Sequence, residues 1–261
     1  MMPPLFLSHG SPMLYLTDTP AHRFLAALGR DMALPRAIVV ASAHWETGMP
    51  AVGAAPRPGT IHDFGGFPDA LHRARWPAPG DPAVAAEVVS ALASAGIGAA
   101  TVADRGLDHG IWVPLAIALP GAEIPVVPLA VQPQRDARHH LALGRALAPL
   151  AERRILVVGS GAVTHNLRAA RGQAVDAPVP AWVDGFRGWV AETAAAGDAE
   201  RLCDWRDAAP GAEINHPMPE HFLPFFVAFG AAGGGAAGCR IHASVEYGAI
   251  GMDAYAFAAR A

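Results

Sequence analysis

Four short apolar runs constrain the fold of this chain more than any other feature. They are rich in β-branched residues and bounded by turn residues, as is typical of strands buried on both faces. The runs are PLFLS (4–8), AIVVASA (37–43), IPVVPLAV (124–131) and RILVVGS (154–160). Helical patterns lie between them, at 22–32, 81–96 and 139–153. This alternation predicts an α/β fold with a mostly parallel or mixed central sheet and helices on both faces.

Length and composition favour one domain over residues 1–261. Hydrophobic residues make up 52% of the chain and charged residues 16%, which is sufficient for a sizeable buried core. No internal repeat or linker divides the sequence. The C-terminal segment 239–258 alternates less regularly, and we expect it to add an edge strand. Helical spacing places Trp182, Phe186 and Trp189 in the core.

Charge and hydropathy indicate a small-molecule partner. The net charge is -4 without runs of like charge, which argues against nucleic-acid binding. The low-charge stretches 111–131 and 222–239 are interrupted by prolines or glycines, so we expect no membrane helix. Cys203 and Cys239 are too few for a disulfide framework. The first ten residues lack the features of a signal peptide, so we expect a cytoplasmic protein; its oligomeric state is left open.

Three histidines are placed near the ends of predicted strands. His9 follows the run 4–8, His44 follows 37–43, and His165 lies five residues beyond 154–160. Ligands of open α/β sheets bind beyond the carboxyl ends of the strands, so these side chains should meet at one edge. Imidazole is a common ligand of zinc and non-haem iron. We therefore predict a metal site, although any one of these histidines alone is equally typical of a hydrogen-bonded turn.

The stretch NHPMPEHFLP (215–224) holds further candidate ligands between prolines that restrict its backbone. Pro219 followed by an acidic residue is typical of a helix start. We expect His221 to project from that start and complete the site. Glu220 is the rival, because two histidines and a carboxylate commonly bind non-haem iron. His216 is predicted to orient a ligand. The alternative is a rigid surface turn with incidental histidines.

Six motifs stand in order along the chain: SHGSP (8–12), SAHW (42–45), IHDFGGFP (61–68), DHGIWVPL (108–115), GSGAVTHNL (159–167) and HPMPEHFLP (216–224). Together they give the chain a resemblance to a known family. It resembles the class III extradiol ring-cleavage dioxygenases, with a LigB-like fold, and within them the DODA-type 4,5-DOPA branch. The resemblance runs from about residue 3 to 255. It implies one α/β catalytic domain with a mixed sheet.

The resemblance also implies roles for individual residues. Metal-binding histidines of the family fall on His9, His44 and His221. His165 corresponds to a histidine at the metal in this branch and to the acid/base of the wider family. His109 matches a histidine that faces the substrate. An all-histidine site suits one divalent ion per chain, Fe(II) or Zn(II).

The expected reaction joins O2 to a small aromatic diol, a catechol, and opens its ring. His165 is predicted to remove a catechol proton and later return it. His109, backed by Asp108, is predicted to hydrogen-bond substrate or oxygen. His62 and Asp108 are the predicted substrate-binding residues, with the loop 62–68 covering the ring. The alternatives are a helix N-cap for Asp108 and an ordinary surface turn for the loop.

Two other functions are compatible with a histidine-rich site on this scaffold. The first is a zinc hydrolase with a metal-bound water and Glu220 or His165 as base. The second is a non-catalytic metal-binding relative. The six intact motifs argue against the non-catalytic relative, whereas the zinc hydrolase stays open as an alternative. The segment 168–214 matches no sharp motif and is expected to shape the pocket walls or a subunit contact.

Overall fold

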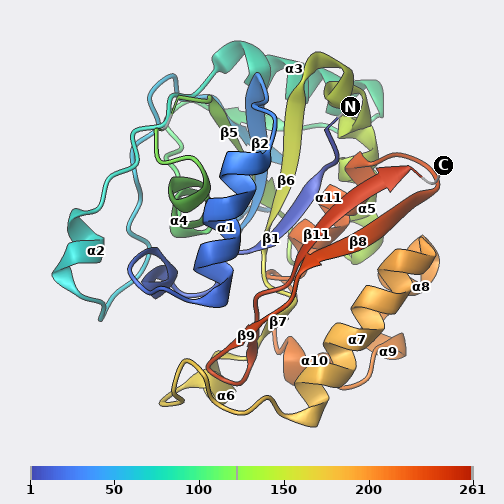
Figure 1. Cartoon of the computed structure of the whole chain (residues 1–261). Coiled ribbons are helices and arrows are strands. Elements are labelled where there is room, and N and C mark those ends of the chain that lie inside the picture. Colours follow the sequence, from blue (N-terminus) through green and yellow to red (C-terminus); the bar gives the residue numbers. More distant parts are fainter. Residues whose placement is uncertain (1, 122, 260–261) are drawn as a thin grey trace.

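The four predicted strands form the centre of one large sheet. The computed structural model describes residues 2–121 and 123–259 (Figure 1). Neighbouring central strands are parallel, in the order β5-β2-β6-β1. They are β1 (Leu5–Ser8), β2 (Ala37–Glu46), β5 (Val126–Val131) and β6 (Ile155–Gly161). Most of their residues are buried, so their sequences are mainly apolar, and polar residues such as Ser8 and His44 stand toward their carboxyl ends.

Two further strands on each side of these four bring the sheet to eight strands. β3 (Ala51–Gly53) pairs antiparallel with β5, and β4 (Ala100–Val102) pairs parallel with β3. At the other side, β11 (Ala254–Ala259) and β8 (Ala236–His242) add antiparallel strands. The predicted C-terminal edge strand is therefore β8, whereas β11 lies inside the sheet, between β1 and β8. The mixed α/β fold class is confirmed.

Helices cover both faces of the sheet, as Figure 1 shows. On one face, α1 (Pro20–Asp31) and α4 (His109–Ala118) pack against alternate strand residues, including Ile38 and Leu156. On the other face lie α3 (Pro82–Ser94), α5 (Ala137–Leu147) and α11 (Leu223–Ala231), over residues such as Val39 and Val157. The alternation follows from the period of two along a strand.

Local signals explain where these helices begin and end. Asp81 accepts hydrogen bonds from the backbone N–H groups of Ala83 and Val84, and Pro82 occupies the first position of α3. The predicted helix 139–153 divides into α5 and the 3-10 helix η2 (Ala148–Arg153). Pro149 lies at this change, where it lacks the N–H that would continue the α-helix.

The remaining elements surround the carboxyl ends of the central strands. A second, three-stranded sheet consists of β7 (Thr164–His165), β10 (Ile250–Gly251) and β9 (Val245–Glu246). The 3-10 helix η1 (Pro12–Tyr15) follows β1, and α2 (Asp69–Arg73) follows the loop 61–68. The segment 168–214 consists of one longer helix and several short ones. They are α6 (Leu167–Ala170), α7 (Ala181–Ala196), α8 (Ala199–Cys203), α9 (Trp205–Ala208) and α10 (Ala212–Asn215).

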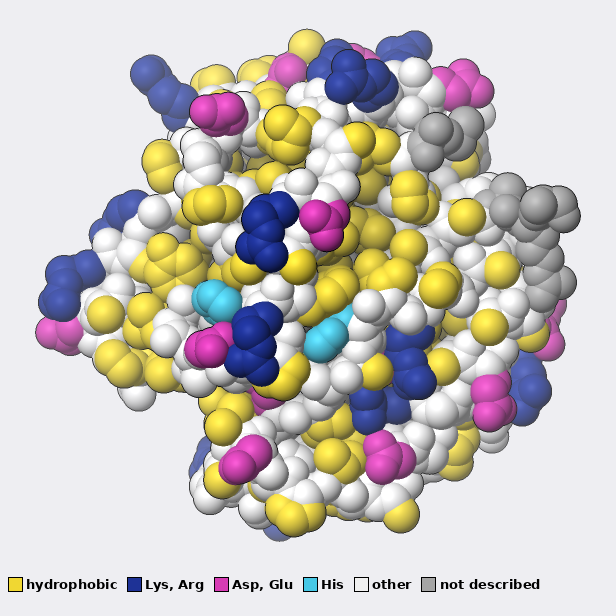
Figure 2. Space-filling view, in the orientation of Figure 1, with side chains coloured by type: hydrophobic (Ala, Val, Ile, Leu, Met, Phe, Trp, Pro, Cys, Tyr) yellow, Lys and Arg dark blue, Asp and Glu magenta, His cyan; other side chains and the backbone are white. Residues whose placement is uncertain are grey.

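The prediction that the aromatic residues of α7 belong to the core is largely confirmed. Phe186 and Trp189 are buried, and Trp182 is half-buried. Within residues 2–121 and 123–259, none of the helices combines the length and apolar character that a membrane crossing needs. On the face in Figure 2, acidic and basic side chains are interspersed among apolar ones. Cys203 and Cys239 are both free.

Candidate metal centre

Three histidine side chains meet at the carboxyl edge of the central sheet. Nε2 of His44 lies 3.0 Å from Nε2 of His9 and 3.2 Å from Nε2 of His221. One nitrogen of each ring lies within 4.8 Å of the other two. His9 directly follows β1, His44 belongs to β2, and His221 precedes α11. Three segments far apart in sequence thus place their imidazoles close enough to share a single ion.

Two of the predicted positions differ locally from expectation. His44 does not follow its strand but lies within it, because β2 continues to Glu46 after a register irregularity against β5 that begins at Ser42. His165, five residues beyond the predicted strand, lies in a further short strand, β7, that was not predicted, and it pairs there with Ile250 of β10. In both cases a short or irregular strand has no clear period in the sequence.

The predicted helix start at Pro219 is wrong by several residues. Residues 219–222 form a turn in which the N–H of Phe222 donates to the carbonyl of Pro219, and α11 begins at Leu223. Pro224 is therefore the second residue of the helix, where its missing N–H costs no helical hydrogen bond. The turn is held on β6 because the N–H of Ala162 donates to the carbonyl of His221, at 2.9 Å.

The second ring nitrogen of His9 has a partner that sets its tautomer. Nδ1 of His9 lies 3.0 Å from Oγ of Ser160. The Ser160 hydroxyl donates its own hydrogen to the carbonyl of Gly110, so its oxygen is left to accept from His9. His9 therefore carries its hydrogen on Nδ1, and the Nε2 lone pair faces the other two rings.

The other two rings have carboxylates beside Nδ1. Nδ1 of His221 lies 2.9 Å from Oε1 of Glu220, and Nδ1 of His44 lies 3.5 Å from Oδ2 of Asp63. A carboxylate on Nδ1 orients a ligating histidine and strengthens Nε2 as a donor. The three Nε2 lone pairs therefore converge, and this donor set fits Zn(II) or Fe(II).

Burial keeps the imidazoles of this site uncharged. It lowers the pKa of His44 to about 3 and, together with nearby His109, the pKa of His165 to about 4. Burial and the neighbouring histidines also lower the pKa values of His9 and His221 well below their ordinary range. Since a metal binds only neutral imidazole, the site is in its ligating protonation state at neutral pH.

His165 and His109 border the three converging rings. The ring of His165 stacks on that of His221, with centroids 3.4 Å apart and planes 12° apart. The ring of His109, the first residue of α4, lies 3.9 Å from that of His44 and 5.5 Å from that of His9. The structure therefore brings all five of these histidines together.

The predicted partner of His109 is wrong. Its Nδ1 lies 3.0 Å from Oδ1 of Asp63, rather than beside Asp108. Asp108 is fully buried: its Oδ1 accepts from the Ser42 hydroxyl at 2.6 Å, and its Oδ2 accepts from Arg105 at 2.6 Å. Both Asp108 oxygens are engaged inside the protein, so this geometry does not support direct contact with substrate. In the sequence, the position of Asp63 directly after His62 in the motif IHDFGGFP was the feature that could have identified it as the partner of His109.

The structure also places His62. Nε2 of His62 lies 3.0 Å from the carbonyl oxygen of Ala74. Its ring lies 5.7 Å from the ring of Phe64, which itself lies 5.7 Å from that of His109. The loop thus reaches the site through Phe64 and Asp63 more closely than through His62.

His216 does not orient a ligand ring as predicted. Its Nε2 donates to the carbonyl of Val163 at 2.7 Å, and its ring stacks on Phe222. It therefore acts on the backbone that leads into β7, and through it on the position of His165.

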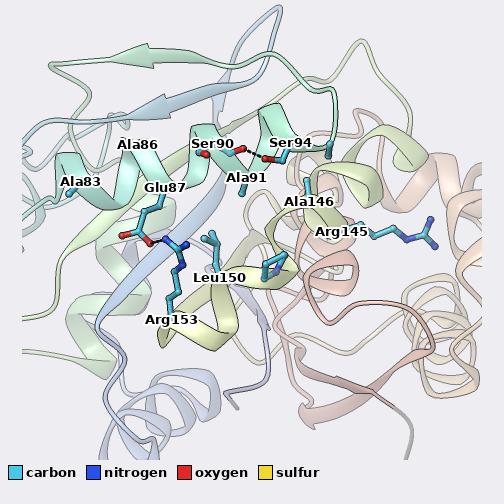
Figure 3. A pocket seen from close by; sticks show the side chains of 12 residues that line it. Ala83, Ala86, Glu87, Ser90, Ala91, Ser94, Arg145, Ala146, Leu150 and Arg153 are labelled. Atoms are coloured by element: carbon cyan, nitrogen blue, oxygen red, sulfur yellow. Dashed lines mark hydrogen bonds and ion pairs between the residues drawn. The ribbon is translucent and has the colours of Figure 1, made fainter.

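A separate groove lies between α3 and η2 (Figure 3). It is lined mainly by small residues of α3 and by Arg145 and Arg153, and Arg153 pairs with Glu87. Glu87 also pairs with Arg36, which directly precedes β2, so the groove lies toward the amino ends of the strands. Its lining, among the described residues, includes none of the predicted site residues.

Fold and site together define an α/β protein whose sheet carries a histidine-rich group able to bind a metal. Residues 3–258 match the family described as the catalytic LigB subunit of aromatic ring-opening dioxygenase. The chain belongs to this family, which confirms both the resemblance and the enzyme class predicted from the motifs.

Named relatives agree with this assignment. The chain is 40% identical over 256 residues to a 4,5-DOPA dioxygenase extradiol of Beta vulgaris, covering 97% of this chain and 95% of the relative. It is 41% identical over 236 residues to the enzyme of that name from Escherichia coli K12, covering 88% and 85%. A crystal structure of an uncharacterized protein from Escherichia coli K12 superposes with a TM-score of 0.83 at 34% identity, covering 98% of this chain and 99% of that one.

Proposed function

We propose that this protein is an extradiol dioxygenase that cleaves the aromatic ring of a DOPA-like catechol and incorporates both atoms of O2. Family membership and the relatives named for 4,5-DOPA support the reaction class and the kind of substrate. The observation that carries the proposal is the convergence of three Nε2 atoms with His165 and His109 at their border. Family membership also favours ring opening over the zinc hydrolase and over a non-catalytic role.

His9, His44 and His221 would hold one divalent ion, Fe(II) or Zn(II), with His165 beside them. Bound there, the ion would supply Lewis-acid chemistry toward a catechol and, in the case of iron, redox chemistry toward O2. Glu220, Ser160 and Asp63 keep the ligating rings oriented from behind. Glu220 is thus assigned to the support of His221 rather than to the metal.

His165 acts as the base in this proposal. The pKa of a catechol hydroxyl lies well above neutral pH, so a neighbouring group must assist removal of its proton. His165 is neutral and stacks directly on His221, so a catechol held at the ion would have its oxygens within reach of this ring. The same ring returns the proton as the aromatic ring opens.

His109, whose ring borders those of His44 and His9, orients the substrate in this proposal. With its hydrogen on Nδ1 facing Asp63, it presents Nε2 as an acceptor for a substrate hydroxyl. His62 and Phe64 of the loop 61–68 lie beyond it and form one wall of the ring-binding region. Asp108 contributes indirectly, by holding the start of α4 against β2 through Ser42.

Oxygen consumption tests this function. Metal-free protein is reconstituted anaerobically with Fe(II), mixed with DOPA or simpler catechols, and exposed to O2 in an oxygen electrode. Stoichiometric uptake with a yellow ring-opened product is expected, and neither should occur with the His9→Ala protein. Absence of uptake with every catechol, together with zinc-dependent hydrolysis of an ester, would establish the hydrolase instead.

The cytoplasmic location expected from the sequence stays a prediction.

A further inference from the structure

Asp63, in the loop 61–68, contacts two histidines of the site. Its Oδ1 accepts from the backbone N–H of His109 at 2.9 Å and from Nδ1 of the same residue at 3.0 Å. Its Oδ2 lies 3.5 Å from Nδ1 of His44. The side chain of Asp63 is 23% exposed, and those of His44 and His109 are 22% and 8% exposed. One carboxylate therefore lies between a predicted ligand and the histidine predicted to face the substrate.

The hydrogen bond from the backbone N–H of His109 to Asp63 lies at the first residue of α4. Asp108 stands at the N-cap position but makes no side-chain capping hydrogen bond, because its oxygens are taken by Ser42 and Arg105. Asp63 supplies the missing acceptor from a different segment of the chain. A carboxylate at a helix N-terminus is stabilised by the helix dipole. Asp63 is therefore held at the N-terminus of α4.

The carboxylate is ionised at neutral pH. Asp63 is partly exposed, and its position at the N-terminus of α4 and its two hydrogen bonds from His109 favour the charged form. An ionised carboxylate accepts hydrogen bonds at both oxygens and donates none. Both facing histidines must therefore carry their hydrogen on Nδ1 to avoid two lone pairs in contact.

We propose that Asp63 is a positioning residue that sets the tautomers of His44 and His109 together. For His44 this directs the Nε2 lone pair to the metal. For His109 it presents Nε2 as the acceptor for a substrate hydroxyl, a role that rests on the proposed function. One side chain thus couples metal binding to substrate orientation, and the loop 61–68 is part of the site's scaffold as well as its wall.

The variant Asp63→Asn tests this arrangement sharply, because an amide has only one oxygen. Whichever way the amide is turned, only one of the two histidines can keep its acceptor, and the other meets an N–H donor. If the oxygen stays on His109, zinc affinity falls by about 10- to 100-fold through His44. If the oxygen turns to His44, the Nδ1–H form of His109 is lost and kcat falls by about 100-fold or more at little-changed KM.

Two measurements separate these cases. Long-range ¹H–¹⁵N correlation spectra of the metal-free and zinc-loaded protein report the tautomer of each histidine, and zinc titration against a chelator reports affinity. Asp69→Asn is the matched control, since Asp69 is six positions further along, is 88% exposed and pairs only with Arg73 among the described ion pairs. It should match the wild type in both.

Either tautomer loss at His109 or weakened zinc binding in Asp63→Asn supports the proposal. It is overturned if Asp63→Asn keeps the wild-type tautomers and binds zinc within threefold of wild type. It is also overturned if His109 of the wild type carries its hydrogen on Nε2. Because these readouts need no turnover, an inactive wild-type protein would refute the proposed function without affecting this result.

Discussion

Gly161, the last residue of β6, lies directly against the backbone of His221. A methyl group on Gly161 would stand 2.0 Å from the carbonyl oxygen of His221, far inside contact distance. The next residue, Ala162, donates its N–H to that same oxygen. The absence of a side chain at position 161 is therefore what allows the turn before α11 to deliver His221 to the other histidines.

Replacing Gly161 by Ala should displace this turn. We expect a loss of about 3 kcal/mol in the free energy of unfolding and a clear drop in bound zinc, because backbone atoms have to move. Urea unfolding and metal analysis measure the two effects. Gly188→Ala is the control, since nothing lies within 4 Å of a methyl group there and the helix α7 should gain up to about 1 kcal/mol. Equal behaviour of the two variants would contradict the packing argument.

Removing a ligand and removing the substrate-facing histidine should have different effects. His9→Ala and His44→Ala are expected to lose metal on purification, because two remaining imidazoles bind a divalent ion far more weakly. His109→Ala should keep its metal and lose about 100-fold or more in kcat. Metal content and oxygen uptake distinguish the outcomes, with His139→Ala as a control, because the His139 ring contacts Gln132 and not a predicted ligand. Full metal retention by His9→Ala would show that the site is wrongly assigned.

Glu220 and His221 can be distinguished by conservative replacement. The amide oxygen of Glu220→Gln can still accept from Nδ1 of His221, so zinc affinity should change by less than about 10-fold. His221→Gln should remove a ligand and abolish tight binding. Chelator competition measures both affinities. The reverse ranking would assign the carboxylate, rather than the imidazole, to the metal.

Buried neutral histidines should make the metal-free protein sensitive to acid. Outside the site, burial lowers the pKa of His140 to about 4, while its Nε2 accepts from the N–H of Gln132 and its Nδ1 donates to the carbonyl of Asp136. The unfolded chain, with a histidine pKa of about 6.5, binds more protons between these values. The stabilisation is therefore complete above pH 6.5 and is lost as the pH falls toward 4, by about 3 kcal/mol for this residue.

The variant His140→Asn tests that slope. Denaturant unfolding of the metal-free protein between pH 4 and 7 should show a weaker decline in the variant than in the wild type. The half-buried His139, one position away, serves as the comparison through His139→Asn, which should change the slope less. An unchanged slope in His140→Asn would mean that this imidazole is already charged in the folded protein.

Much of the candidate metal centre was predictable from sequence because strand ends are local features. Apolar runs buried on both faces identify β1, β2 and β6, and parallel strands bring the residues after them to one edge. The apolar pattern alone is therefore enough to predict that His9 and His44 lie close together. His221 was supported more weakly, by prolines and by the family motif, and its helix was predicted to start too early.

Other features depended on contacts between segments that have no common local pattern. The pairing of Asp63 with His109 spans 46 residues, and nothing in the period of either segment indicates it. No local pattern indicates that β11 pairs beside β1, or that the backbone of His221 packs directly on Gly161.

The sequence by itself determined the α/β class, the central strands and the edge at which the histidines gather, because the spacing of apolar residues sets which faces are buried. Only the tertiary structure decided which nitrogen of each ring faces inward and which hydroxyl or carboxylate lies beside the other nitrogen. Those choices depend on differences of an ångström or less in packing and on single hydrogen bonds, and the spacing of residues along a chain does not contain them.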